Sequence, residues 1–291
     1  NSLIESFMGV DLSKLTYEKE YKKDKGEISL FDNEKNRLQK TVSHLLSSYY
    51  SCSDHDRKVK LQQEISDTIN KQLEAQAYDT TILKKLKAIN LAENNQFFLW
   101  HTWFSDVFNR QDGKNGFDIV IGNPPYIGEK GHKEIFQPVK SDIHLGQYYL
   151  GKMDYFYFFF HLAFNMLSPH GIATFITTNY YPTALGARKL RADIKDRMNI
   201  KTLFNLGELR LFENAPGQHN MISSFAKGKD GCKCQVIDVH KKGALNPIMF
   251  TSIINHTDEE TTYADIAQED LYDGEENYIR LQNCNGDNPL S

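Results

Sequence analysis

The sequence predicts an α/β fold in which a long helical segment precedes half of a doubly wound sheet. Residues 13–90 are highly charged and contain no proline, and their apolar residues recur at helical spacing. From residue 97 to residue 225, apolar runs of strand length alternate with helical stretches, as they do in sheets built from βαβ units. The 291 residues are 40% hydrophobic, which is enough apolar material for one large core or two smaller ones.

The first part of the chain predicts three helices. The first carries four apolar residues at helical spacing, namely Leu38, Val42, Leu45 and Leu46. The second is expected from Asp56 to about Ala75 and the third from Thr81 to Ile89. Their mixture of charged and apolar residues indicates a solvated scaffold without chemistry of its own.

The second part predicts a parallel sheet with covering helices. Strands are expected at residues 117–121, 172–177, 201–206, 221–226 and 235–240, and helices at residues 155–167 and 185–197. The run from Phe117 to Ile121 is β-branched or aromatic, which predicts a strand buried on both faces. Residues 241–291 are rich in Asn, Asp and Gly and predict a linker.

A turn of sequence Asn123-Pro124-Pro125-Tyr126 follows that strand directly. Gly122 allows the backbone to pass close to a ligand, and the two prolines remove amide donors and fix the backbone. The carbonyls of the turn must therefore find donors outside the sheet, and a ligand amino group is a natural donor. Ligands of doubly wound sheets bind beyond the carboxyl ends of the strands, where this turn would lie.

The segment Phe117–Ile127 resembles motif IV of the amino methyltransferases that use S-adenosylmethionine, in the form found in gamma-class, Type IIG-like adenine-N6 DNA methyltransferases of restriction-modification enzymes. A Pro-Pro turn alone is weak evidence for a family, but the strand before this turn and the residues around it strengthen the evidence. The resemblance extends to four further segments: residues 1–4 (end of motif III), 97–108 (lead-in to motif IV), 154–171 (motif V) and 206–225 (motif VIII). It implies a Rossmann-like, incomplete methyltransferase fold with a helical insertion.

The same resemblance implies the roles of the catalytic residues. The Asn123 side-chain oxygen and the Pro124 carbonyl would accept hydrogen bonds from the exocyclic amine of adenine, with Pro125 and Tyr126 completing the catalytic turn. The adenine would be flipped out of the duplex and stacked between Tyr126 and Phe212. An ordinary core position is the alternative for Phe212.

Cofactor and DNA contacts follow from the resemblance as well. Asn1, Asn123 and Phe159 would bind S-adenosyl-L-methionine, although a core role for Phe159 is about as well supported. Lys130 and Lys133 would contact phosphates of double-stranded DNA, with a solvated loop as the alternative.

The glycine-rich Phe-x-Gly-x-Gly segment of the family is not evident in this sequence. We therefore expect a fragment that lacks an upstream cofactor-binding and nuclease segment and a downstream target-recognition domain. Within it, residues 1–95 would form the end of motif III and the helical insertion, residues 96–240 the catalytic core, and residues 241–291 the linker.

Composition excludes few classes of protein. The net charge of −4 gives no overall positive field, so DNA contacts must come from local basic patches. The four cysteines and ten histidines show no metal-ligand spacing, which predicts no metal site. The apolar run at residues 155–167 is too short to span a membrane and no signal peptide is evident, so we expect a cytoplasmic protein without membrane contact.

Two other functions share this turn. Enzymes that methylate a glutamine amide nitrogen in proteins also carry Asn-Pro-Pro-Tyr, but they lack a long helical insertion. A fragment that only binds DNA as a scaffold is the non-catalytic alternative. Cytosine-N4 methylation is disfavoured, because relatives with that activity usually have Ser in place of Asn123.

Overall fold

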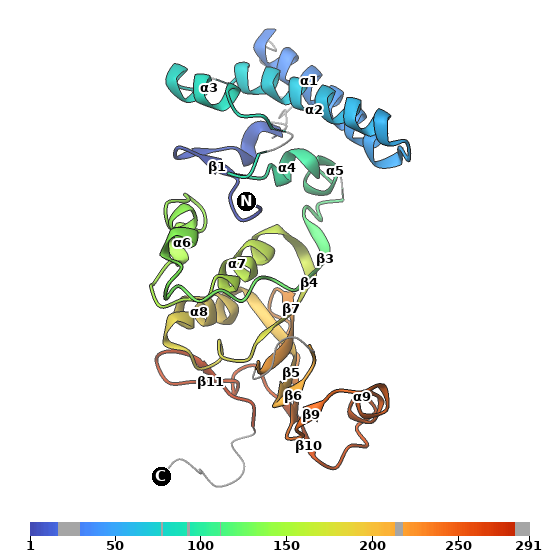
Figure 1. Ribbon diagram of the computed structural model, residues 1–291, viewed down its shortest axis with the longest axis vertical. Helices are drawn as coiled ribbons and strands as arrows, with labels where there is room; N and C mark the ends of the chain where they lie inside the picture. Colours follow the sequence, from blue (N-terminus) through green and yellow to red (C-terminus); the bar gives the residue numbers. More distant parts are fainter. Residues whose placement is uncertain (17–29, 77, 92–93, 111, 213–217, 283–291) are drawn as a thin grey trace. The chain divides into compact units, whose positions relative to one another are not determined.

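The computed structural model describes residues 1–16, 30–76, 78–91, 94–110, 112–212 and 218–282 (Figure 1). The chain divides into two compact units. Residues 1–115 together with 141–144 form one, here called the helical unit, and residues 116–140 together with 145–291 form the other, called the sheet unit. This division does not coincide with the boundaries expected after residues 95 and 240.

Three helices dominate the helical unit and confirm the sequence prediction: α1 (Leu30–Ser51), α2 (His55–Glu74) and α3 (Thr80–Lys87). Helices α2 and α3 begin at aspartate caps, in which the side chains of Asp54 and Asp79 accept hydrogen bonds from backbone amides of the first turn. Apolar residues of α1 and α2 are buried between the helices, among them Leu38, Val42, Leu61, Ile65 and Ile69.

The rest of the helical unit is built from short elements. Strands β1 (Ser6–Phe7) and β2 (Val10–Asp11) form a hairpin whose turn residues, Met8 and Gly9, both have positive φ, as a tight two-residue hairpin loop requires. They are followed by the 3₁₀ helix η1 (Ser13–Thr16), and later in the chain by α4 (Trp100–Trp103) and α5 (Ser105–Phe108).

The sheet unit contains a six-stranded mixed sheet of order β10-β8-β5-β7-β4-β3. The strands are β3 (Phe117–Gly122), β4 (Leu167–Thr178), β5 (Met198–Gly207), β7 (Asn220–Lys227), β8 (Cys234–Val239) and β10 (Thr261–Ile266). β3 pairs with β4 in parallel, and so does β5 with β8. The expectation of a parallel sheet is wrong for β7, which runs antiparallel to both β4 and β5. Among the described residues between β5 and β7 there is no helix, whereas a crossover to a parallel neighbour usually contains one.

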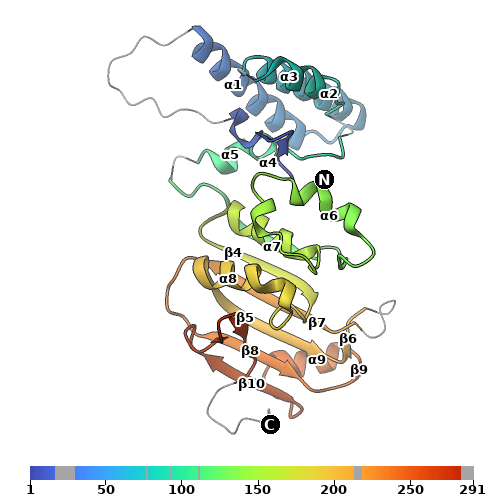
Figure 2. The same cartoon turned by 90° about the vertical axis from the view of Figure 1, so that its left-hand side faces the viewer.

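Helices cover both faces of this sheet. α7 (Phe156–Met166) and α8 (Arg188–Arg197) lie on one side and α9 (Pro247–Ile254) on the other (Figure 2). Phe160 of α7 stacks on Phe175 of β4, with ring centroids 4.6 Å apart, and meets Phe225 of β7 edge-on at 5.4 Å. On the opposite face, Ile253 of α9 joins a buried cluster with residues of β5 and β8. Of the described helices, none is long and apolar enough to cross a bilayer.

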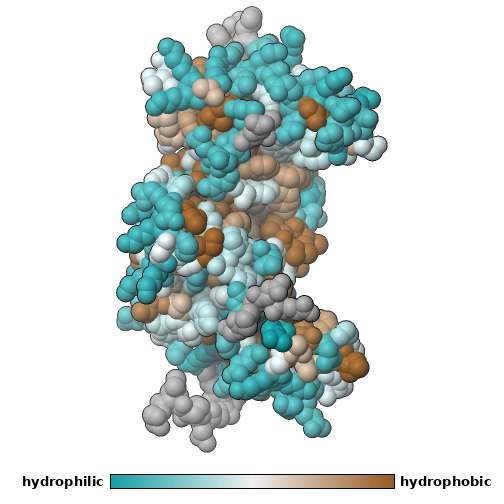
Figure 3. Space-filling model, viewed as in Figure 1, coloured by the Kyte–Doolittle hydropathy of each residue, from teal (hydrophilic) through white to brown (hydrophobic). Residues whose placement is uncertain are grey.

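Strand β3 occupies the edge of the sheet. Ile119 is 65% and Ile121 79% exposed, and Ile172 of β4 beside them is 39% exposed. Figure 3 shows hydrophobic surface on this side of the molecule. The expectation that the strand is buried on both faces is therefore wrong, because composition alone does not distinguish an edge strand from a central one.

The segment after residue 240 differs from the expected linker. β10 extends the sheet by pairing with β8, and α9 begins at Asn246, whose side chain caps it, with Pro247 at its first position. β11 (Tyr272–Asp273) and β12 (Tyr278–Ile279) form a further ribbon, and the Ile279 amide donates to the Pro182 carbonyl at 3.0 Å. Most of this segment is thus integrated into the sheet unit. Five smaller elements also belong to the unit: α6 (Lys133–Lys140), the 3₁₀ helices η2 (Gly146–Tyr148) and η3 (Leu185–Ala187), and the paired strands β6 (Leu209–Arg210) and β9 (Gly243–Ala244).

Candidate active site at the carboxyl edge of the sheet

The Asn-Pro-Pro-Tyr turn leaves the sheet at the carboxyl end of β3. Asn123 and Pro125 are exposed, whereas Pro124 is buried. A Cβ atom added at Gly122 would lie 2.7 Å from Cε1 of Phe175, so a residue with a side chain would displace that ring. Glycine therefore lets β3 pack closely on the core while the turn presents the Asn123 side chain to solvent.

Tyr126 fixes the far end of the turn. Its hydroxyl lies 2.8 Å from Asn123 Oδ1 and 3.0 Å from the carbonyl oxygen of Ile176, so its single proton is shared between these two acceptors. Its ring meets Phe156 edge-on at 6.2 Å, which connects the turn to the first residue of α7. Burial raises the pKa of Tyr126, and a hydrogen bond from Asn220 partly offsets this effect. The hydroxyl thus stays protonated at neutral pH and orients the carboxamide of Asn123.

Neutral amides continue along the same edge of the sheet. The Asn179 side chain, just after β4, donates to Asn205 Oδ1 of β5 at 2.9 Å, and Asn205 donates in turn to Asp238 Oδ1 of β8 at 2.7 Å. Asn220, at the start of β7, donates to the Thr177 carbonyl at 3.4 Å. These residues, Asn179, Asn205, Asn220 and Asp238, are called the amide network below. It connects four adjacent strands beside the turn.

Sequence reasoning missed Asn179 and Asn205. Each is a polar residue at the carboxyl end of a predicted strand, and that position is the signal that would have identified it. Two rings lie at the same edge: Tyr180 is 51% exposed, and its ring centroid is 6.4 Å from that of His219. The Asn179 amide donates to the His219 carbonyl at 3.0 Å, which holds the two loops together.

The other predicted site residues are more dispersed. Phe159 lies on α7, half-buried, with its ring edge-on to Tyr155 at 6.0 Å. Phe212 follows β6 and is half-buried. Asn1 belongs to the helical unit, where its side-chain oxygen accepts from the Leu3 amide at 3.2 Å and its amino group donates to the Asn95 carbonyl at 2.8 Å. The structure brings Asn123 and Tyr126 together, and the catalytic and binding roles of all these residues remain predictions.

Lys130 and Lys133 both line one pocket of about 750 Å³ in the sheet unit. Their predicted contact with DNA remains a prediction. Across the described ranges, no group of three or more His, Cys, Asp or Glu side chains is placed to hold a metal ion.

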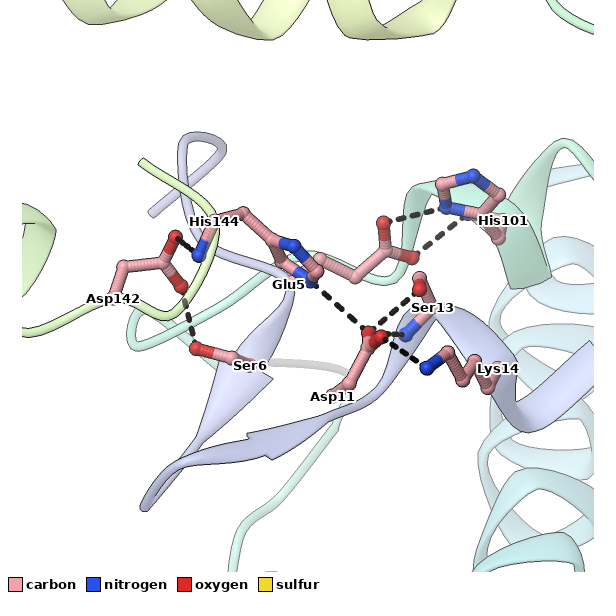
Figure 4. A network of polar contacts seen from close by, with 8 residues as sticks. All are labelled: Glu5, Ser6, Asp11, Ser13, Lys14, His101, Asp142 and His144. Atoms are coloured by element: carbon pink, nitrogen blue, oxygen red, sulfur yellow. Dashed lines mark hydrogen bonds and ion pairs between the residues drawn. The ribbon is translucent and has the colours of Figure 1, made fainter. Parts of the chain in front are cut away.

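The helical unit has a polar network of a different kind (Figure 4). Buried Glu5 accepts hydrogen bonds from the backbone amide of His101 at 2.8 Å and pairs with its ring Nδ1 at 2.7 Å. His144 Nε2 lies 3.1 Å from Asp11 Oδ1, and Ser6 donates to Asp142. These contacts attach residues 141–144 to the N-terminal hairpin, which explains why that short segment belongs to the helical unit.

Comparison with known proteins agrees with the turn and its setting. Residues 7–212, more than half of the chain, match the family model described as Eco57I restriction-modification methylase. The Type II methyltransferase M.HincII of Haemophilus influenzae is 25% identical over 133 residues, which make up 45% of this chain and 26% of that protein. The chain thus spans about a quarter of the length of that relative.

Solved structures give more distant likenesses. The EcoKI M protein of a Type I restriction enzyme has a TM-score of 0.42 at 14% identity, covering 80% of this chain and 60% of that one. A type I restriction-modification methyltransferase subunit from Streptococcus thermophilus has a TM-score of 0.41 at 17% identity, covering 59% and 39%. The assignment rests on the family match, which also confirms the resemblance seen in the sequence: the chain belongs to the family of Eco57I restriction-modification methylases.

Proposed function

We propose that this chain carries the catalytic turn of a site-specific DNA adenine-N6 methyltransferase that uses S-adenosylmethionine and acts within a restriction-modification enzyme. The observation that carries the proposal is the exposed carboxamide of Asn123, which stands at the carboxyl end of β3 and is oriented by the Tyr126 hydroxyl. Family membership supports methyl transfer in a restriction-modification system. Adenine as the target and base flipping are part of the proposal.

An exocyclic amine is a poor nucleophile because its lone pair is delocalised into the ring. The Asn123 side-chain oxygen and the Pro124 carbonyl would accept hydrogen bonds from the two amine N–H groups and localise the lone pair on nitrogen. The hydrogen bonds to these acceptors become stronger as positive charge develops on the amine nitrogen. They therefore stabilise the transition state more than the ground state. A carboxamide suits this role because it remains an acceptor at every physiological pH.

The methyl donor, S-adenosylmethionine, is expected to lie beside the turn. The exposed Asn123 carboxamide and the half-buried Phe159 ring fit the polar and apolar parts of S-adenosylmethionine, and these two residues would hold it. When bound, the cofactor supplies a sulfonium methyl group to the amine nitrogen, with the sulfur leaving as a thioether. Tyr126 and Phe212 would stack on the flipped base, at roughly 1 to 3 kcal/mol for each ring.

The test uses a protein that extends upstream of Asn1, and measures tritium transfer from labelled S-adenosylmethionine to duplex DNA rich in different sites, followed by identification of the labelled base. We expect label on adenine, and a loss of about 100- to 1,000-fold for Asn123→Ala with unchanged DNA affinity. Asn115→Ala, at an exposed asparagine outside the site, is the matched control and should retain activity. Equal methylation by Asn123→Ala would refute the catalytic assignment, and label in protein but not in DNA would indicate a glutamine methyltransferase.

A further inference from the structure

A lysine-lined pocket lies beside the candidate active site. It has a volume of about 750 Å³ and is lined by residues of α6 and of the segment that leads into α7. Its charged lining residues are four lysines and two acids, namely Lys130, Lys133, Lys140, Lys152, Glu129 and Asp154. The local balance is therefore positive in a chain whose net charge is −4.

The two acids are engaged inside the protein. The Tyr149 hydroxyl donates to Glu129 Oε1, and the Met153 amide donates to Glu129 Oε2 at 3.4 Å. Asp154 accepts from the Tyr157 hydroxyl at 3.2 Å. The carboxylates thus bond to groups in the walls of the pocket: both Glu129 oxygens and one Asp154 oxygen already have donors.

The four lysines differ from the two acids in their contacts. In the part of the chain that the structure describes, none of them forms an ion pair with an acidic side chain. Lys140 instead places its ammonium group over the Tyr149 ring, 4.8 Å from the centroid. Ammonium groups on flexible stems bind phosphate as point charges, and here several converge on one cavity.

The pocket has a well-defined frame. Lys152 has φ of 52°, a left-handed conformation that is rare for a residue with a side chain, and Gly151 before it has φ of 96°. Gly186 packs directly on this turn, since an added Cβ would lie 2.0 Å from the Lys152 carbonyl oxygen. Lys189 donates to the Tyr149 carbonyl at 2.9 Å, and the Glu129 amide to the Met153 carbonyl at 2.8 Å.

The pocket and the catalytic turn meet at the start of α7. The Tyr126 ring packs against Phe156, and Asp154, two residues earlier, lines the pocket. The Tyr155 amide donates to the Ile127 carbonyl at 2.8 Å, which joins the residue after the turn to the same segment. A DNA strand whose target base lies at Asn123 would therefore have its phosphate backbone close to the lysines.

We propose that this pocket binds phosphate, and that in the working enzyme the phosphate belongs to the DNA backbone beside the target base. The DNA part rests on the proposed function. The lysines would neutralise backbone charge without reading sequence, so they raise affinity equally for all duplexes and steepen its dependence on salt. Lys140 and Lys152 thus join Lys130 and Lys133 in one site.

The experiment compares two double variants of equal charge change. Lys130→Gln/Lys133→Gln removes two pocket lysines, and Lys84→Gln/Lys85→Gln removes two exposed lysines of α3 as the control. The two probes are inorganic phosphate and a 20-base-pair duplex of arbitrary sequence, both titrated without cofactor over a range of salt concentrations. We expect the pocket variant to bind the duplex roughly 10-fold more weakly, with a salt slope smaller by about 2, and the control to match wild type.

The outcomes separate the possible sources of the phosphate. Weaker phosphate binding with unchanged duplex binding would overturn the DNA assignment and leave a pocket for free phosphate. Equal losses in the pocket variant and the control would overturn the site altogether. Because no methyl transfer is measured, failure of the proposed function would appear only in the Asn123→Ala assay and would not be confused with failure here.

Discussion

The N-terminal hairpin of the helical unit and the carboxyl edge of the sheet unit organise their polar side chains in different ways. At the hairpin, carboxylates pair with histidines: Glu5 meets His101 and Asp11 meets His144. The edge of the sheet unit is built mostly from neutral groups. Tyr126 and the asparagines of the amide network contact backbone carbonyls and one another, and Asp238 is the one carboxylate of that network. Pairs of two ionisable groups respond to pH, whereas neutral amides keep their donors and acceptors at every pH. A site that must accept hydrogen bonds from an amine gains from the second arrangement.

The largest effect on stability is expected when a second carboxylate enters the amide network beside Asp238. Asn205→Asp would place a second carboxylate next to Asp238, where the wild-type amide now donates at 2.7 Å. Repulsion would raise the pKa of the introduced carboxyl in the folded protein. The resulting loss of stability is absent at pH values below the ordinary carboxyl pKa, and it grows as pH rises through the raised pKa. We expect a loss of about 2 to 3 kcal/mol in the free energy of unfolding at pH 8, and little loss at pH 4.

Urea unfolding of wild type and variant between pH 4 and pH 8, followed by tyrosine signals, measures this loss. Asn205→Ala is the matched control, because it removes the same hydrogen bonds without adding charge. Its loss should be nearly independent of pH. A pH-independent loss in Asn205→Asp would show that the amide network tolerates charge, and the contrast between the two units would fail.

A smaller effect is expected for Tyr126→Phe. The variant keeps the ring and its edge-on contact with Phe156 but removes the hydroxyl that donates to Asn123 and Ile176. A neutral hydrogen bond contributes about 1 kcal/mol, which predicts a roughly 5-fold lower kcat for methyl transfer with unchanged DNA affinity. Tyr180→Phe, an equal change at an exposed tyrosine of the same edge, should leave kcat unchanged. Equal kcat values for both variants would mean that the hydroxyl does not orient Asn123.

The fold was largely predictable wherever local pattern dominates. Helical periodicity correctly placed α1, α2 and α3, and apolar runs placed β3, β4, β5, β7 and β8. The direction of each strand and its position in the sheet could not be predicted from local pattern. The exposure of Ile121 depends on which strands lie beside β3, and the antiparallel direction of β7 depends on how the chain returns from β5 to the sheet, so both are properties of the assembled sheet.

The site was predictable only as far as a contiguous motif reaches. The turn from Asn123 to Tyr126 was identified because its four residues are adjacent in sequence. Asn179 and Asn205 are 26 residues apart and meet only because parallel strands end at the same edge. The lysine pocket was seen as a loop with basic residues, but its acids and their internal hydrogen bonds could not be inferred from composition.

The smallest effects are expected inside the charged network, where two carboxylates should respond to pH with opposite signs. Burial raises the pKa of Glu5 despite its hydrogen bonds from His101. Burial alone would also raise the pKa of Asp11, but hydrogen bonds from Ser13 and His144 bring it below its ordinary value. The stability contributed by Glu5 is therefore present in acid and lost as pH rises, whereas that of Asp11 is present at neutral pH and lost as pH falls.

Glu5→Gln and Asp11→Asn test this opposition. Both tryptophans of the chain, Trp100 and Trp103, lie in the helical unit, so their fluorescence during urea unfolding follows that unit. Between pH 4 and pH 7, the wild type should lose on the order of 1 kcal/mol of unfolding free energy as pH rises and Glu5 ionises, and Glu5→Gln should not show this loss. Asp11→Asn should instead remove a gain that wild type shows at lower pH, as pH rises through the lowered pKa of Asp11 to just above the ordinary aspartate value of about 3.9, so the series for this variant extends below pH 4. Shifts of the same sign in both variants would mean that the two carboxylates share one environment, and that burial rather than the individual partner determines how this network responds to pH.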